Sequence, residues 1–361
     1  MIPVTKTCLP ELDEYVSQLS EIWKTGWLTN NGTYSKKLTS DLISYLNVPN
    51  LELIGNGTLA IQLAIQALDL TGEIITTPYS YVATTTAILW ENCDPVFVDI
   101  NRESLCIDPE LIEAAITEKT SAILATHVYG LPCDVVKIEQ IARKYQLKVI
   151  YDAAHCFGVN YRGQSILKYG DCSTISFHAT KLFHTVEGGA VVCADDRIAQ
   201  RIFLSKKFGH HGEDDYFQIG INAKLSEFHA AMGVCMLPLI DSLIQRRKQI
   251  SQSYNHLLEG CEIRRPVIPA DLEYNYSYYP LIFNSHTAMS NVRQALLDQR
   301  VMTRRYFYPS LNTLNYLRPE LKRPCPISEE IADRVLCIPL YPELQQTDLD
   351  IISHTILREF K

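Results

Sequence analysis

The sequence predicts an α/β fold, with a large domain built on a mostly parallel sheet and a smaller C-terminal α+β domain. The main observation is an alternation of short apolar runs with helical patterns, from about residue 50 to residue 195. This alternation is typical of a parallel sheet covered by helices on both faces. A long helical stretch follows at 224–259, and a tyrosine-rich section with further strands and helices comes last. We therefore predict a large domain at 1–249 and a small domain at 250–361.

The individual elements follow from the same patterns. Strands are expected at 51–54, 73–77, 96–99, 122–126, 148–151, 174–177 and 190–193, and helices at 58–70, 109–117 and 135–145. Pro238 should kink or interrupt the long helical stretch, because proline has no backbone N–H to donate. In open sheets of this type ligands bind beyond the carboxyl ends of the strands. The residues that follow each strand are therefore the candidates for a functional site.

Composition excludes several classes of protein. Of the 361 residues 47% are apolar and 20% are charged, and the net charge of -8 argues against nucleic acid as the main partner. It does not exclude a local cationic pocket for a phosphorylated small molecule. The eleven cysteines form no C-x-x-C pair, so we expect neither a zinc site nor a disulfide framework. No signal core and no run of about 20 apolar residues is present, so we expect a reduced, cytoplasmic protein without a membrane anchor.

The first strand end carries the segment GNGTLA, which begins at Gly55. Two glycines and a threonine at the start of an apolar helix place N–H groups and a hydroxyl at the positive end of the helix dipole, where a phosphate can bind. A plain strand–turn–helix connection with Thr58 as the helix cap explains the same segment. A nicotinamide-binding turn is not favoured, because the third glycine of G-x-G-x-x-G is missing.

Two further strand ends carry side chains suited to a planar, charged ring. Tyr81 can stack on such a ring, although an aromatic residue at this place can equally belong to the core. Asp152 ends an apolar strand, so its carboxylate should be partly buried and should need a cationic partner. A protonated pyridine nitrogen would serve as that partner. A helix cap or an internal salt bridge is the alternative reading of the same residue.

Lys181 is the one lysine of the segment SFHATKLFHTVEGGAVVC, between an apolar run that ends at Phe177 and another that begins after Gly188 and Gly189. On its own it could be a solvated loop lysine. Together with a phosphate cradle, a stacking aromatic and a buried acid, it completes the parts of a pyridoxal phosphate site. Such a site needs a lysine that bonds to the cofactor and an acid beside the pyridinium nitrogen.

These residues lie in segments that resemble the sugar aminotransferases of the DegT/StrS family, pyridoxal phosphate enzymes with the aspartate-aminotransferase fold (fold type I). The resemblance covers essentially the whole chain, from GWLTNNG at Gly26 to PLYPEL at Pro339. Its most specific part runs from DAAH through SFHATK to EGG. Further matching segments are NGTLA, TPYSYVAT, HVYGLPCD, YDAAHCFG and GINAKLSEFHAAMG with its downstream RR.

The resemblance implies a role for single positions. Lys181 matches the catalytic lysine that bonds to the cofactor and moves the proton. Asp152 matches the partner of the pyridine nitrogen, and His155 matches the neighbour of the cofactor's ring hydroxyl. Tyr81 matches the stacking aromatic. The other cofactor-binding positions are Gly57, Thr58, Leu59 and Ser176 in the phosphate cradle, His178 at the same strand end, and Asn222.

Asn222 matches an asparagine that reaches the phosphate from the other subunit, which implies a homodimer with shared active sites. Ala223 and Lys224 depart from the family, which more often shows an aromatic residue and an arginine there. Lysine cannot make the bidentate contacts of arginine. This puts the substrate or interface contacts of this segment in question, but it does not touch the cofactor site.

The implied activity is transfer of an amino group from L-glutamate to C4 of a nucleotide-linked 4-keto-6-deoxy sugar. We expect dTDP-4-dehydro-6-deoxy-D-glucose as the acceptor, in the synthesis of O-antigen sugars for lipopolysaccharide. C3 amination and a non-catalytic binding protein of the same fold are the alternatives, whereas Lys181 argues against a dehydratase of the family. His184 and Tyr308 are candidate substrate-binding residues, and no metal site is expected.

Overall fold

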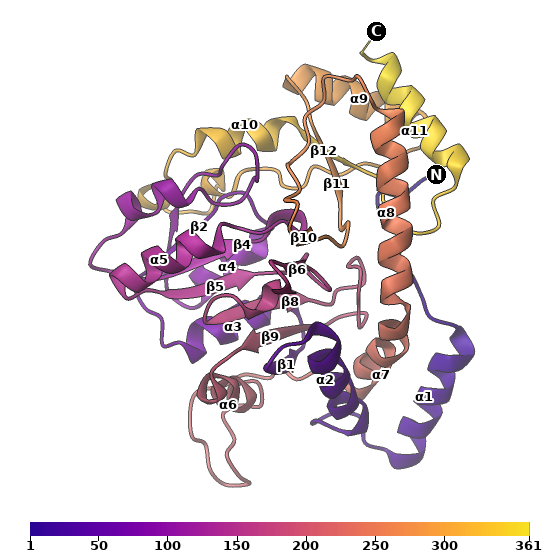
Figure 1. Ribbon diagram of the computed structural model, residues 1–361. Coiled ribbons are helices and arrows are strands. Elements are labelled where there is room, and N and C mark those ends of the chain that lie inside the picture. Colours follow the sequence, from indigo (N-terminus) through magenta and orange to yellow (C-terminus); the bar gives the residue numbers. More distant parts are fainter. Residues whose placement is uncertain (361) are drawn as a thin grey trace.

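The structure is a computed structural model that describes residues 1–360 (Figure 1). Its centre is a seven-stranded sheet with the strand order β1-β9-β8-β5-β4-β2-β3. The strands are β1 (Asn50–Ile54), β2 (Glu73–Thr76), β3 (Asp94–Phe97), β4 (Thr120–Thr126), β5 (Lys148–Asp152), β8 (Cys172–Ser176) and β9 (Gly189–Cys193). Only β9 runs antiparallel to its neighbours, β8 and β1. The predicted, mostly parallel sheet is therefore confirmed.

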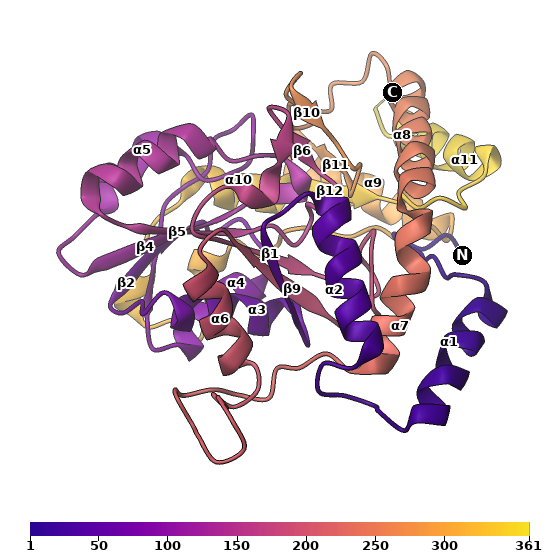
Figure 2. The same cartoon turned by 60° about the horizontal axis from the view of Figure 1, so that its bottom comes forward.

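Helices cover both faces of this sheet (Figures 1 and 2). On one face lie α3 (Gly57–Ala67), α4 (Val82–Trp90) and α6 (Asp196–Ser205), and on the other lie α2 (Thr33–Leu46), α5 (Val135–Tyr145) and α7 (Glu227–Met236). Neighbouring strand residues point to opposite faces, so that Ile74 belongs to the core cluster that contains residues of α3 and α4, whereas Ile75 belongs to the cluster that contains residues of α2 and α5. Burial on both faces explains why the strands read as continuous apolar runs.

The C-terminal section has a core of its own. Strand β11 (Tyr279–Ile282) pairs antiparallel with β12 (Val335–Ile338), and helices pack around the pair. These helices are α8 (Ile240–Leu257), α9 (His286–Asp298) and α11 (Gln346–Arg358). Helix α10 (Pro326–Arg334) lies beside α9, but its buried residues Ile331 and Ala332 belong to the core of the large sheet. The proposed boundary at 249/250 lies inside α8. Leu243 packs with the large sheet, whereas Tyr254 packs with the C-terminal core.

Shorter elements complete the fold. Helix α1 (Leu12–Thr25) packs beside α7, and a small sheet joins β10 (Leu272–Glu273) to β6 (Asn160–Tyr161) and β7 (Gln164–Ser165). The 3₁₀ turns are η1 (Pro109–Leu111), η2 (Glu113–Ala115), η3 (Val128–Gly130), η4 (Ile166–Lys168), η5 (Leu237–Leu239), η6 (Leu311–Thr313) and η7 (Pro319–Leu321).

Two expectations about helices have different outcomes. The α-helix expected at 109–117 is wrong, because the segment forms the 3₁₀ turns η1 and η2 instead. Its buried residues, Ile112 and Ala115, are three positions apart, and this spacing matches the three residues per turn of a 3₁₀ helix. The interruption expected at Pro238 is confirmed, since this residue lies in η5 between α7 and α8.

One helical stretch, Glu227–Leu257, is long and apolar enough to cross a membrane by length and composition alone. Half of its most apolar window is buried inside the protein. Residues of α7 pack on the large sheet and residues of α8 pack in the C-terminal core, so packing within the protein accounts for its apolar character. All eleven cysteines are free thiols. Within residues 1–360 no group of three His, Cys, Asp or Glu side chains could hold a metal ion.

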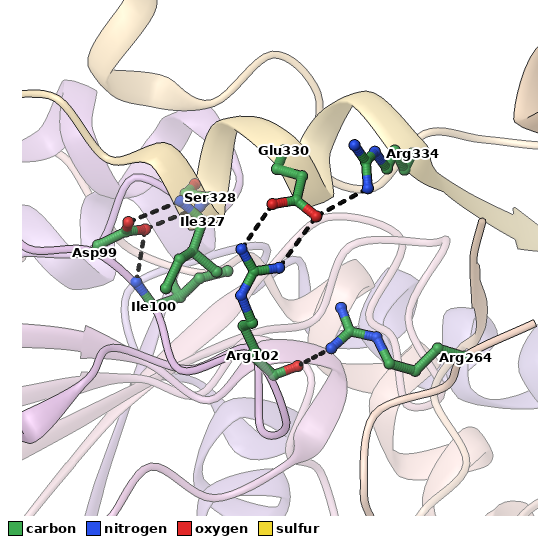
Figure 3. A network of polar contacts seen from close by, with 8 residues as sticks. All are labelled: Asp99, Ile100, Arg102, Arg264, Ile327, Ser328, Glu330 and Arg334. Carbon is green, nitrogen blue, oxygen red and sulfur yellow. Dashed lines mark hydrogen bonds and ion pairs between the residues drawn. The ribbon is translucent and has the colours of Figure 1, made fainter. Parts of the chain in front are cut away.

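A polar network joins the C-terminal section to the large sheet (Figure 3). The buried carboxylate of Asp99, just beyond β3, accepts hydrogen bonds of 2.8 Å from the backbone N–H groups of Ile327 and Ser328. These groups belong to the first turn of α10, where the helix dipole favours a negative charge. Arg102 adds a bidentate ion pair with Glu330 of the same helix, at 3.0 and 2.7 Å. The network fixes α10 against the large sheet.

We predict that Asp99→Ala lowers the free energy of unfolding by about 1–3 kcal/mol, because it leaves buried N–H groups at a helix start without an acceptor. Urea denaturation measures the change. Asp94→Ala is the matched control, since Asp94 forms an exposed ion pair with Arg318 and should cost at most about 1 kcal/mol. Equal losses in the two variants would contradict the role given to Asp99.

Candidate active site

The carboxyl ends of β4, β5 and β8 meet at one edge of the sheet, where Asp152 lies. Its side chain is 5% exposed. One carboxylate oxygen accepts a hydrogen bond of 2.6 Å from the Thr84 hydroxyl, and the other accepts one of 3.1 Å from the N–H of Ala154. Burial raises the pKa of the Asp152 carboxyl, whereas these two hydrogen bonds and the charge of Lys181 act to lower it. The expected burial of this acid is confirmed.

Lys181 lies in the tight connection between β8 and β9. Backbone hydrogen bonds close this connection, among them Phe177 N–H to Gly188 O at 2.8 Å and Lys181 N–H to His178 O at 2.8 Å. The Nζ atom donates to the Tyr278 hydroxyl at 3.4 Å. Burial lowers the pKa of the Lys181 ammonium, and the nearby charge of Asp152 opposes this effect. Lys181 is therefore held by the fold and is not a solvated loop lysine.

Glycines bring the first turn of α3 against the ends of β8 and β9. A Cβ atom on Gly189 would lie 2.7 Å from the carbonyl oxygen of Ile175 and 2.9 Å from the nitrogen of Gly57. A Cβ atom on Gly57 would lie 3.0 Å from the Cβ of Ser176. Only residues without side chains allow this close approach, and it places the Ser176 hydroxyl beside the start of α3.

The start of α3 is arranged to receive an anion. Its cap is Asn56, whose side-chain oxygen accepts a hydrogen bond of 2.9 Å from the N–H of Leu59, so the alternative reading of Thr58 as the cap is wrong. Among the described residues no partner engages the N–H groups of Gly57 and Thr58. These two groups and the Ser176 hydroxyl are the donors open to a phosphate.

His155 follows Asp152 at the same edge and is buried. Its Nδ1 atom accepts a hydrogen bond of 3.2 Å from the backbone N–H of Tyr129, which leaves Nε2 to carry the proton. Burial lowers the pKa of the His155 imidazole, and the charge of Lys181 adds to this effect, so the ring is neutral. Phe307 lies nearly parallel to it, with ring centroids 5.6 Å apart.

Three other predicted cofactor residues are accessible. Tyr81 directly precedes α4 and is 59% exposed, so its reading as a core aromatic is wrong, and its ring is free to stack. His178 is exposed and hydrogen-bonds through Nδ1 to the Thr180 hydroxyl at 2.8 Å. Asn222 is exposed and accepts a hydrogen bond of 2.6 Å from Lys224, the residue that departs from the family pattern. Their roles toward a cofactor stay predictions.

The two predicted substrate residues lie in different environments. His184 is only 1% exposed, and both of its ring nitrogens bond to the protein, Nε2 to the carbonyl of Cys8 at 2.7 Å and Nδ1 to the N–H of Val186 at 3.3 Å. It anchors the N-terminal segment, so we correct its assignment to a structural role. Tyr308 is exposed with the Arg305 guanidinium over its ring, and its role stays a prediction.

Sequence reasoning missed several residues that surround the site. Thr84 holds Asp152, Tyr129 holds His155, and the aromatic rings of Phe307 and Tyr278 lie next to the imidazole of His155. The segments TPYSYVAT and HVYGLPCD already contain Thr84 and Tyr129, so those positions could have been found. The other two come from the C-terminal section and carry no local signal of this kind.

Comparison with known proteins is consistent with this geometry. The model of the DegT/DnrJ/EryC1/StrS aminotransferase family matches residues 11–357. The dTDP-4-amino-4,6-dideoxy-D-glucose transaminase of Escherichia coli is 41% identical over 373 residues, which cover 99% of this chain and 98% of that protein. The transaminase of the same name from Shigella dysenteriae is 42% identical over 364 residues, again covering 99% and 98%.

A solved structure agrees with the same family. The crystal structure of DesI in the presence of its TDP-sugar product has a TM-score of 0.94 and 29% sequence identity, and the match covers 99% of this chain and 93% of that chain. The chain therefore belongs to the DegT/DnrJ/EryC1/StrS aminotransferase family, an assignment that makes it an enzyme of the transaminase class. The expected aspartate-aminotransferase fold is confirmed.

Gly189→Ala should lower the free energy of unfolding by about 1–3 kcal/mol, because the new methyl group would overlap backbone atoms that cannot move aside. Gly55→Ala is the matched control at the same helix start. Its Cβ atom would have no neighbour closer than 3.6 Å, so the change should stay below about 1 kcal/mol. Urea denaturation compares the two variants. A Gly189→Ala protein as stable as the Gly55→Ala protein would contradict the close approach described above.

Proposed function

We propose that the protein is a pyridoxal phosphate-dependent aminotransferase that moves an amino group from L-glutamate to C4 of a nucleotide-linked 4-keto-6-deoxy sugar. The observation that carries this proposal is the placement of a buried acid, Asp152, and a partly buried amine, Lys181, at one edge of the sheet. The names of the two transaminases at 41 and 42% identity favour dTDP-4-dehydro-6-deoxy-D-glucose as the acceptor. They also favour C4 over C3 amination. O-antigen synthesis in the cytoplasm is the setting that we infer.

The residues present fit the cofactor. The first-turn N–H groups of Gly57 and Thr58 would hold its phosphate together with the Ser176 hydroxyl. The carboxylate of Asp152 would face its pyridine nitrogen, and Tyr81 would stack on its ring. When bound, pyridoxal phosphate supplies an aldehyde that bonds to amines and a protonated ring that withdraws electrons.

Lys181 has the properties of a nucleophile and a proton carrier. Because burial lowers the pKa of its ammonium, more of the side chain is the neutral amine near neutral pH than in an ordinary lysine. The neutral amine can attack a carbonyl carbon and can later take a proton from a carbon atom beside it. The side chain is therefore suited to both roles that the family resemblance implies.

Asp152 and His155 support this chemistry with fixed hydrogen bonds. The Thr84 hydroxyl that holds Asp152 is itself 2.7 Å from the Ser80 hydroxyl, to which Thr126 donates at 3.0 Å. This chain of hydroxyls fixes the carboxylate, which would face the pyridine nitrogen of the bound cofactor. His155 is neutral, with Nε2 as a donor that can bond to a ring oxygen. Both groups are buried, and the rings of Tyr278 and Phe307 lie beside His155.

The wild-type protein with L-glutamate and dTDP-4-dehydro-6-deoxy-D-glucose should give a sugar with an amine at C4, identified by NMR. Lys181→Ala should lose turnover by at least about 10³-fold, because it removes the nucleophile and the proton carrier together, while the far-UV circular dichroism stays unchanged. Lys322→Ala changes an exposed lysine and serves as the control. An amine at C3, or turnover retained in Lys181→Ala, would contradict the proposal.

We further propose a homodimer in which Asn222 reaches the cofactor phosphate of the partner subunit. The exposure of this side chain supports the proposal. Asn222→Ala should weaken cofactor retention about tenfold, because a hydrogen bond to a charged group contributes roughly 1.5 kcal/mol. Equilibrium dialysis measures the retained cofactor, and the exposed Asn315→Ala is the control. Unchanged affinity in Asn222→Ala, or a monomer in gel filtration, would remove the shared-site proposal.

A further inference from the structure

The tyrosine-rich section near residue 276 lies next to the site, although it is almost a hundred positions from Lys181 in the sequence. The Tyr278 hydroxyl accepts the hydrogen bond of 3.4 Å from the Lys181 amine. The Tyr278 ring also meets the imidazole of His155 edge-on, with ring centroids 4.9 Å apart and an angle of 73°. Tyr278 is therefore in contact with two residues that face the proposed cofactor.

The backbone around Tyr278 is bonded to the same large-domain segment that carries the imidazole. The Ser277 hydroxyl donates to the carbonyl of His155 at 2.7 Å. The side-chain amide of Asn275 donates to the same carbonyl at 2.8 Å and to the carbonyl of Phe157 at 2.9 Å. Asn275 is fully buried. These bonds set the position of Tyr278 relative to the sheet edge, independently of the contact with Lys181.

A buried arginine, Arg247, bonds to the backbone of the tyrosine-rich section. Arg247 of α8 is 5% exposed, and its guanidinium donates to the carbonyls of Tyr276 and Ser277 at 3.3 Å each. Within the described residues no carboxylate lies within 4.0 Å of it. Burial raises the pKa of the Tyr278 phenol, and the charge of Arg247 opposes this effect only in part, so the phenol stays protonated at neutral pH.

We propose that Tyr278 is a further catalytic residue, whose hydroxyl holds the free amine of Lys181 beside the reacting atoms. This inference rests on the proposed function. With the cofactor bound, the Lys181 amine would be free in part of each half-reaction and would have to stay close enough to move a proton. A long, flexible side chain needs a partner for this, and Tyr278 is the one side chain within 1–360 that accepts a hydrogen bond from its Nζ atom. The hydroxyl provides that partner.

The hydrogen bond between Lys181 and Tyr278 is long, which suits a contact that the amine must also be able to break. At 3.4 Å it is longer than the usual N–H···O range, so the amine can exchange it for a covalent bond at little cost. The phenol oxygen also stabilises the ammonium form of Lys181, because that form is the better donor. Loss of the hydroxyl should therefore lower the pKa of the amine further and should leave the amine less ordered.

The test follows the condensation of the Lys181 amine with the aldehyde of added pyridoxal phosphate, in which a C=N bond forms and one water leaves. Its rate in cofactor-free protein is measured by absorbance across pH, and the product is trapped with borohydride. In Tyr278→Phe the plateau rate should fall about threefold, which is within the range for one hydrogen bond and reflects the length of this one. The acid limb of the pH profile should move to lower pH, because the neutral amine is then present at lower pH.

Tyr276→Phe is the matched control, since it makes the same change two positions away, where within 1–360 the hydroxyl has no hydrogen-bond partner. It should match the wild type in both the plateau and the acid limb. Tyr278→Gln restores a hydrogen-bond acceptor without the ring, so its acid limb should move back toward that of the wild type. A Gln variant with the same acid limb as Tyr278→Phe would assign the effect to ring packing and overturn the proposal.

The outcomes separate this proposal from the proposed function. If the wild type forms no trapped product at Lys181, the proposed function fails. If the wild type reacts and Tyr278→Phe has the same plateau and the same acid limb, the proposed function stands and the role of Tyr278 is wrong. Thermal unfolding of each variant, followed by circular dichroism, confirms that the compared proteins are folded.

Discussion

The surrounding structure depends on two ionisable groups at one edge of the sheet, the buried carboxyl of Asp152 and the partly buried amine of Lys181. Removing such groups from water is costly, and each is only partly compensated. Thr84 and Ala154 bond to the acid, and Tyr278 bonds to the amine. Within residues 1–360 the acid and the amine form no ion pair of 4.0 Å or less. The protonation state of each group can therefore change when a charged group binds between them.

The sheet topology brings these groups together. Strands β5 and β8 run parallel and in register, so Asp152 and the end of β8 reach the same edge, and the turn into the antiparallel β9 carries Lys181 back over it. The C-terminal section then closes the site. Phe307 packs on His155, and the carbonyl of Tyr306 accepts a hydrogen bond from Tyr79 at 3.2 Å. The Asp99 network holds α10, which follows this segment, against the large sheet.

The sequence was sufficient for the features that depend on local pattern. Strands buried on both faces give apolar runs, Pro238 breaks a helix wherever it lies, and the residues at strand ends pointed to Asp152 and Lys181. Contacts between segments that are far apart in the sequence have no local pattern that would predict them. Thr84 lies 68 positions from Asp152 and Tyr278 lies 97 positions from Lys181, so only the folded chain joins them. Conversely, His184 is near Lys181 in sequence, but the turn directs it into the protein.

The central claim is that the amine of Lys181 bonds to the aldehyde of pyridoxal phosphate. The most direct measurement is reduction of the cofactor-saturated protein with borohydride, followed by proteolysis and mass mapping of the peptides. We expect one stoichiometric adduct, on the peptide that contains Lys181. An adduct on another lysine, or no adduct at saturating cofactor, would contradict the account.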